Sequence, residues 1–391
     1  MSLLVEPFPE TLDRSLLQVF LFGADMGEAI AVALPERGWI LVDGCRLEVG
    51  DNEVFPALEA YLELRSGDDD PVELLVWTHP HADHYLGIRE AIERHRPVRV
   101  GMTLAETPVP GSASKEVEAL GSHPMLPADL RLQDVFKQVK STIERVFHYW
   151  RGKPESRLLL SAQTSPLELG ATRVRAFSPD QAALKAFYSR GVEGLRAALK
   201  TQANEYSIVL GLEFGETRLV LGGDLPYRST SGSVLSHGWK WIEENAPELA
   251  AHQGFKVSHH GSAEAIPPFF RGGTAPPPEW LVTPFAREHL PRPGEGEKGG
   301  LQQLLHRAPE LRLTSSVGLV SSPEPGARVC REELRLKLAA VEAGGFSGGL
   351  RAPAASGLFD FAWGVAFDSN RAVKRLFAGR QAITVVEDGD S

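Results

Sequence analysis

Short apolar runs alternate with amphipathic segments over the first hundred residues. Four runs are apolar and partly β-branched, as expected for buried strands: residues 17–22, 29–34, 39–42 and 72–77. A turn at residues 23–27 joins the first two runs and predicts a hairpin. Helices are expected at 53–64 and 87–94, and another strand at 98–102. This order of strand, helix and strand predicts the β-α-β units of an α/β fold.

The same alternation continues around an expected insertion at about 103–157. A loop rich in proline and glycine opens this stretch, and a helical period covers residues 129–150. The insertion either caps the site or covers the sheet without touching substrate. Beyond it, strands are expected at 157–160, 167–169, 173–178, 208–214, 217–224, 280–283 and 358–367, and helices at 181–189, 301–306 and 331–342. We expect one domain over 1–330 and a C-terminal extension over 331–391 packed on the same domain.

Four potential metal ligands follow the run at 72–77 within six positions. They are His79, His81, Asp83 and His84. A proline inside the cluster ends the strand, so the four side chains are expected on a tight turn at the edge of a sheet. Imidazole nitrogens and a carboxylate suit zinc or another borderline divalent ion. Alternate residues of such a turn can face two directions and serve two adjacent metal positions.

The spacing His-x-His-x-Asp-His after an apolar strand resembles the metallo-β-lactamase superfamily. Three further blocks agree with it in order: a strand ending at Asp43, a strand running into Gly-Gly-Asp at Asp224, and the pair His259 and His260 before Gly-Ser. The resemblance spans roughly residues 15–265. It implies an α/β metallo-β-lactamase-like αββα sandwich with a helical insertion.

The resemblance also implies one or two zinc ions, with manganese as an alternative. His79 and His81 would hold the first ion, and Asp224 would bridge both. The second ion would be held by Asp83, His84 and one histidine of the pair, for which we favour His259. His260 would then face substrate or lie behind the ligands. Asp43 would brace the histidine turn.

The ending His-His-Gly-Ser, with Asn-x-x-Ser at 204–207, is similar to the branch that contains the competence protein ComEC. Many superfamily members have a histidine ligand where this chain has Asn204. The first metal position is therefore either short of a ligand or completed by Asn204 and water. A later His-Pro motif has only a loose counterpart at His289, where a role in protonating the leaving group and a plain loop histidine are both open. Together with His289, Asp83 and His260 are the expected catalytic residues.

Charge and composition narrow the classes of function. The chain has 391 residues and a formal net charge of −10, which argues against broad non-specific binding of nucleic acid, although not against a local basic groove. No apolar run reaches the length of a membrane span, and the first residues do not resemble a signal peptide. Two cysteines, Cys45 and Cys330, cannot form a disulfide framework. We therefore expect a cytoplasmic protein with no membrane partner.

These observations predict a metal-dependent hydrolase in which a metal-bound hydroxide attacks the substrate. The ComEC-like resemblance favours a phosphodiester, in nucleic acid or in a small phosphoester. Two alternatives stay open: a lactone or amide hydrolase, and a metal-bound binding module without turnover. Lys256 and Tyr85 either neutralise an anionic substrate or are structural.

Overall fold

The computed structural model describes most of the chain. The described residues are 4–23, 27–67, 69–81, 83–103, 130–189, 203–227, 237–270, 277–285, 290–292, 299–308, 310–315, 324–336 and 357–386. His289, residues 104–129 of the expected insertion and residues 337–342 of an expected helix lie outside them.

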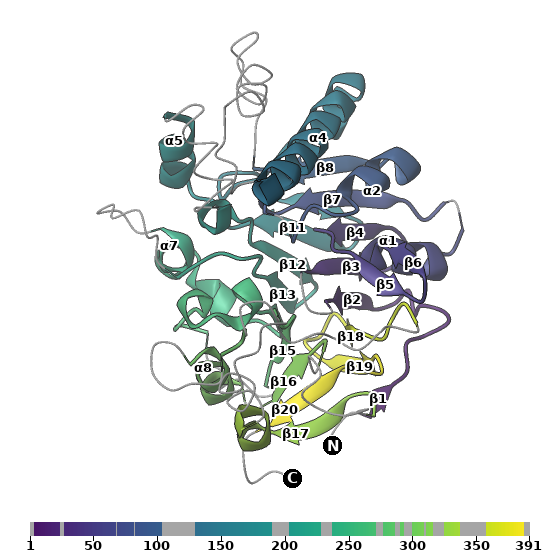
Figure 1. Ribbon diagram of the computed structural model, residues 1–391, viewed down its shortest axis with the longest axis vertical. Helices are drawn as coiled ribbons and strands as arrows, with labels where there is room; N and C mark the ends of the chain where they lie inside the picture. Colours follow the sequence, from purple (N-terminus) through teal and green to yellow (C-terminus); the bar gives the residue numbers. More distant parts are fainter. Residues whose placement is uncertain are drawn as a thin grey trace.

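Two large mixed sheets form the centre of the molecule (Figure 1). The first has the order β1 (Val5–Glu6), β19 (Val373–Ala378), β18 (Ala362–Phe367), β2 (Leu17–Phe22), β3 (Ala29–Ala33), β4 (Trp39–Val42), β7 (Val72–Trp77), β8 (Arg99–Met102), β9 (Arg157–Leu159). The second has the order β10 (Leu167–Leu169), β11 (Thr172–Ala176), β12 (Leu210–Phe214), β13 (Thr217–Leu221), β14 (Gly254–Lys256), β15 (Glu279–Val282), β16 (Glu310–Leu313), β20 (Ile383–Val386), β17 (Ala327–Cys330). A small hairpin, β5 (Leu47–Val49) and β6 (Asn52–Val54), lies outside both sheets.

Alternation along the strand separates two faces in β2, β3 and β4, and each of these three strands is buried along its whole length. In β2, Leu17, Val19 and Leu21 belong to a core between the sheets, together with residues such as Leu210 and Leu219 of the second sheet. The intervening Phe20 and Phe22 belong to a second core, between the first sheet and its helices. Because both faces of the sheet are covered, the strands read as nearly continuous apolar runs.

Helices cover the outer faces of both sheets. Over the first sheet lie α1 (Pro56–Leu64), α2 (Ile88–His95) and α4 (Leu130–Gly152), and over the second α7 (Gly238–Asn245) and α8 (Gly300–Arg307) (Figure 1). A further helix, α5 (Gln181–Ser189), contacts the 3₁₀ turn η3 (Ala203–Tyr206). The layers are therefore helix, sheet, sheet and helix, the predicted αββα sandwich. No helix in the described part of the chain is both long enough and apolar enough to cross a membrane.

The C-terminal region belongs to both sheets. Strand β18 pairs with β2 and β19, while β20 lies between β16 and β17. The sequence predicts only one strand there, at 358–367. It misses β19 because Lys374 and Arg375 interrupt its apolar pattern. The expected helix at 53–64 also begins later, at Pro56, because the β5–β6 hairpin uses the residues before it.

The topology brings four loops together. Strands β4 and β7 are parallel neighbours in the first sheet, and β13 and β14 are parallel neighbours in the second. The loops at the carboxyl ends of parallel strands lie at one edge of a sheet, where α/β proteins commonly place their sites. Asp43, the 79–84 cluster, Asp224 and the 259–260 pair follow these four strands.

Candidate metal centre

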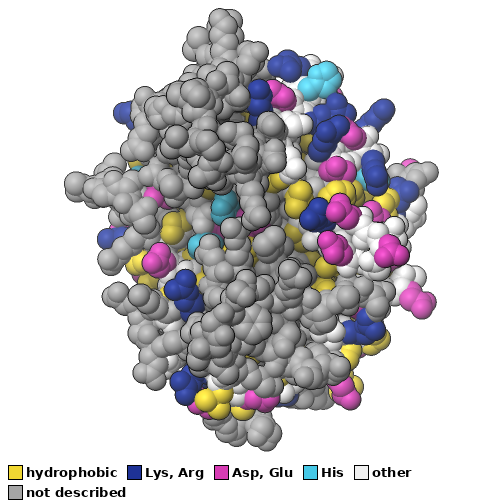
Figure 2. Space-filling view, in the orientation of Figure 1, with side chains coloured by type: hydrophobic (Ala, Val, Ile, Leu, Met, Phe, Trp, Pro, Cys, Tyr) yellow, Lys and Arg dark blue, Asp and Glu magenta, His cyan; other side chains and the backbone are white. Residues whose placement is uncertain are grey.

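The histidine cluster forms a tight turn directly after β7. The amide of His81 donates to the carbonyl of His79 over 2.9 Å, and the amide of His84 donates to the carbonyl of His81 over 3.3 Å. His79 and His84 are buried, whereas the side chain of His81 is 42% exposed. The turn therefore has a buried side and an open side. Figure 2 shows histidine side chains at the surface near the middle of the face in view.

Two groups of potential ligands meet at Asp224. In the first group, His79, His81 and Asp224 have ligand atoms within 4.8 Å of one another. In the second group, Asp83, His84, Asp224 and His260 do so. The Oδ2 atom of Asp224 lies 3.8 Å from Nε2 of His79 and 3.3 Å from Nε2 of His84. Asp224 is thus common to both groups, the position that the resemblance implies for a bridging carboxylate.

The buried atoms at the centre lack hydrogen-bond partners among the described residues. They are Nε2 of His79, Nε2 of His84 and both carboxylate oxygens of Asp224. Buried polar atoms are normally hydrogen-bonded, because leaving them unpaired is costly. Divalent cations between these atoms would satisfy all of them, so the donor set fits a metal centre.

Asp43 holds the turn from behind. Its Oδ1 accepts from the amide of Thr78 over 2.7 Å, and its Oδ2 accepts from the hydroxyl of Thr78 over 2.6 Å and from Nδ1 of His84 over 2.8 Å. With the proton of His84 on Nδ1, the lone pair on Nε2 faces the centre. Nδ1 of His79 similarly lies 2.9 Å from the hydroxyl of Thr78.

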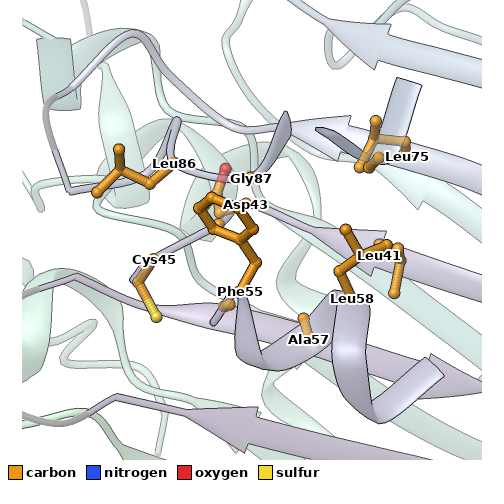
Figure 3. Close-up of a pocket in the computed structure, with 12 residues that line it drawn as sticks. Leu41, Asp43, Cys45, Phe55, Ala57, Leu58, Leu75, Leu86 and Gly87 are labelled. Carbon is orange, nitrogen blue, oxygen red and sulfur yellow. The ribbon is translucent and has the colours of Figure 1, made fainter. Parts of the chain in front are cut away.

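The space behind Asp43 is mostly apolar. Asp43 lines a cavity of about 10 Å³ together with side chains that include Cys45, Phe55, Leu58 and Leu86 (Figure 3). A cavity of this size holds at most about one water. Gly44 completes this wall, since a Cβ there would lie 1.9 Å from the carbonyl of Leu86. The centre is therefore closed on its β4 side.

The structure brings His260, and not His259, into the ligand groups. Both residues lie in the turn η5 (Ser258–Gly261) with left-handed backbone angles, φ 47° and 53°. Nδ1 of the buried His260 donates to the carbonyl of Thr283 over 2.9 Å, and its Nε2 lies 3.4 Å from Oδ2 of Asp83. His259 is half-exposed and belongs to neither group of described ligands. This placement differs from the expected one because the turn directs the second histidine inward.

Ser207 has a role that the sequence analysis missed. Asn204 lies half-buried in η3, and Ser207 follows that turn. The Oγ atom of Ser207 accepts from the amide of Asp224 over 2.9 Å and lies 3.4 Å from Nδ1 of His79. Ser207 thus connects the two ligands that the first group draws from different sheets. The serine of the Asn-x-x-Ser motif at 204–207 could have indicated this role, but only the asparagine of that motif resembles a position of a metal ligand.

The electrostatics favour the metal-binding protonation state at His79 and at Asp224. At His84 they act the other way, because burial alone would lower its pKa, but the neighbouring carboxylates of Asp224 and Asp83 outweigh burial and raise the pKa well above the ordinary value. Burial lowers the pKa of His79 well below its ordinary value, and the neighbouring His84 adds to this. Burial alone would raise the pKa of Asp224, but the adjacent His84 outweighs it, and the pKa lies well below the ordinary value. A neutral imidazole and an ionised carboxylate are the forms that bind a divalent ion.

Lys256 and Tyr85 are both buried and contact other side chains of the protein. Lys256 is 1% exposed and forms an ion pair with Glu28, a residue that the sequence analysis did not single out. The hydroxyl of the buried Tyr85 donates to Gln138 of α4. The burial of Lys256 and the contact of Tyr85 with Gln138 favour roles within the protein over contact with a substrate.

Comparisons with known proteins show the superfamily of this chain. The Metallo-beta-lactamase superfamily matches residues 23–266, more than half of the chain, and the chain belongs to this superfamily. Among solved structures it is similar to a mutant of CmlA beta-hydroxylase, with 14% identity and a TM-score of 0.30, over 66% of this chain and 37% of that one. It is also similar to the metallo-beta-lactamase fold protein YhfI from Bacillus subtilis, with 10% identity and a TM-score of 0.30, over 62% and 70% of the two chains. A search of curated proteins finds no match.

Proposed function

We propose that this protein is a metal-dependent hydrolase that cleaves phosphodiester bonds, in nucleic acid or in a small phosphoester. The observation that carries the hydrolase proposal is the buried Asp224 carboxylate shared by two adjacent ligand groups. When bound, zinc or a similar ion polarises a phosphoryl or carbonyl oxygen and lowers the pKa of a coordinated water.

The proposed ligands come from three separate loops. His79 and His81 would hold one ion, and Asp83, His84 and His260 would hold the other. Asp224, which belongs to both groups, would contribute to both positions. We choose His260 over His259 because its Nε2 points at Asp83 while Thr283 fixes the opposite edge of its ring. The first group has three members and the second has four, so the first is the more open to a further donor.

Exposure indicates the side from which substrate arrives. The side chain of His81 is 42% exposed and that of Asp83 10%, whereas those of His79, His84 and Asp224 are at most 1% exposed. The reacting group therefore meets the centre at its His81 edge. The buried ligands exclude bulk water from the opposite side, which strengthens electrostatic interactions there.

The choice of a phosphodiester rests on the resemblance of residues 204–207 and 256–262 to the ComEC-like branch. The same centre can act on a carbonyl. We therefore propose to assay the zinc- and manganese-loaded protein on bis-p-nitrophenyl phosphate, single-stranded DNA and a panel of lactones. Wild-type protein should cleave a phosphodiester, and Asp224→Asn should reduce the rate by about 100-fold or more, because it removes a ligand charge from both ions.

A matched control is His148→Ala, which removes an exposed histidine on α4 and should leave the rate unchanged. Cleavage of lactones alone would move the assignment to carbonyl chemistry. Metal binding without turnover on any of the substrates would make the protein a binding module and refute the hydrolase proposal.

A further inference from the structure

Lys256 and Glu28 form a buried ion pair behind the proposed ligands. Lys256 ends β14 of the second sheet, and Glu28 directly precedes β3 of the first, so the pair joins the two sheets. Both side chains are 1% exposed. Removing two charges from water carries a penalty that often exceeds their attraction, so a buried ion pair is weak grounds for stability alone.

The lysine end of the pair contacts the loop that carries Asp224. Nζ of Lys256 donates to the carbonyl of Gly223 over 2.9 Å and lies 3.8 Å from Oδ1 of Asp224. A separation of 3.8 Å is too long for a hydrogen bond but short enough for electrostatic attraction. Lys256 thus fixes the carboxylate without occupying its lone pairs, which stay available to cations.

The glutamate end of the pair leads to His260. Oε2 of Glu28 accepts from the hydroxyl of Thr283 over 3.0 Å. The carbonyl of the same threonine accepts from Nδ1 of His260 over 2.9 Å. The contacts therefore run without a break from Asp224 through Lys256, Glu28 and Thr283 to His260.

We propose that Lys256 and Glu28 are positioning residues that hold Asp224 and His260 in register for the second metal ion. The two ligands follow different strands, β13 and β14, and their relative placement decides whether one ion can touch both. Partners behind metal ligands typically change metal affinity by about 10- to 100-fold when removed. This inference rests on the proposed metal centre, although not on the choice of substrate.

A charge-neutral double variant separates positioning from stability. Glu28→Gln with Lys256→Met removes one negative and one positive charge, so the net charge of the site is unchanged and neither partner is left as an unpaired buried ion. The readouts are zinc affinity by chelator competition, the visible absorption spectrum of the cobalt-loaded protein, and thermal stability of the metal-free protein. We expect stability close to wild type, a changed cobalt spectrum, and zinc affinity about 10- to 100-fold lower at one of two positions.

The matched control is the pair Glu279 and Arg312, which joins β15 and β16 over 3.0 Å. Glu279→Gln with Arg312→Met makes the same change of charge and should leave the zinc affinity and the cobalt spectrum as in wild type. If the Lys256 and Glu28 double variant binds zinc like wild type, the pair is structural and the inference is overturned. If the wild type itself binds no zinc, the proposed function fails as well.

Two single substitutions test the same connection if the double variant does not fold. Thr283→Val removes the hydroxyl that donates to Glu28 and also lies 3.1 Å from Nδ1 of His260, and Thr283→Ser keeps it. We expect zinc affinity to fall in Thr283→Val and to be restored in Thr283→Ser. Equal affinities in the two variants would contradict a role for the Glu28 end of the pair.

Discussion

At the scale of single residues, Asp43 decides which nitrogen of His84 faces the centre. Its left-handed backbone, φ 55°, turns the carboxylate back under the histidine turn. Both of its oxygens accept hydrogen bonds, from Thr78 and from Nδ1 of His84. A carboxylate has acceptors on both sides, whereas an amide has a donor on one of them.

Asp43→Asn is therefore expected to weaken the second ligand group. The new amide group would oppose the donors of Thr78 or His84 and release the His84 ring. We expect zinc affinity about 10- to 100-fold lower and a loss of about 1–3 kcal/mol in the free energy of unfolding. Isothermal titration and urea unfolding measure the two effects. Asp51→Asn, at an exposed position, is the control, and an Asp43→Asn protein with unchanged zinc affinity would contradict the role of Asp43.

At Asn204, a substitution is expected to strengthen metal binding rather than weaken it. If it stands where a histidine ligand is found in many superfamily members, the first group holds its ion more weakly than the second. Asn204→His should then retain the weaker ion at chelator concentrations that strip it from wild type, because imidazole is the better ligand for zinc. Elemental analysis after graded dialysis compares the two proteins. Identical metal retention would place Asn204 outside the ligand sphere.

At the scale of elements, the sequence predicts most of the first sheet and the position of the metal turn. Both faces of strands β2, β3, β4 and β7 are covered. These strands therefore appear in the sequence as nearly continuous apolar runs, which predict buried strands. The choice between His259 and His260 has no such signal. Both residues have left-handed backbone angles in η5, and no apolar pattern in the sequence indicates such a turn.

A local sequence pattern also does not predict which residues contact the proposed metal ligands from behind. Glu28 and Thr283 are 255 positions apart in the chain, yet they share a hydrogen bond. Ser207 and His79 approach each other only because the second sheet packs on the first. Such contacts depend on the tertiary arrangement, which a motif of six residues does not contain.

Strand β20 carries a prediction about the C-terminal region. Ile383 is fully buried in the core of the second sheet, far along the chain from the ligands. Ile383→Ala should lower the free energy of unfolding by about 2–5 kcal/mol, since it leaves a cavity in that core. Leu336→Ala, at a side chain that is 56% exposed, should change it by no more than about 0.5 kcal/mol. A separate early unfolding transition in Ile383→Ala would contradict a C-terminal region that is part of the common core.

At the scale of the whole molecule, a buried histidine far from the metal turn should make stability depend on pH. Burial lowers the pKa of His252 to about 4. The ring packs against Phe270, with centroids 4.4 Å apart, and its Nδ1 donates to the carbonyl of Leu249 over 3.0 Å. The unfolded chain takes up a proton below about pH 6.5, whereas the folded protein resists it until about pH 4.

The stability that His252 contributes is therefore complete above pH 6.5 and is lost as the pH falls towards 4. The full difference of about 2.5 units corresponds to about 3 kcal/mol. Urea unfolding of the metal-free proteins at pH 7.5 and pH 5 measures this effect. The free energy of unfolding should fall less between pH 7.5 and pH 5 in His252→Phe than in wild type. His148→Ala, at an exposed histidine, is the control. A wild-type pH dependence in His252→Phe would show that other groups cause it.

The shared position of Asp224 has a mechanical consequence for the sandwich. Four proposed ligands follow a strand of the first sheet: His79, His81, Asp83 and His84. Asp224 and His260 follow strands of the second sheet, so ions bound at the centre would cross-link the two sheets. Loading would then raise the unfolding temperature of the whole protein in proportion to the logarithm of free metal. Amide hydrogen exchange at the carboxyl ends of β7 and β13 should slow most, because the ions would bind where these two strands end.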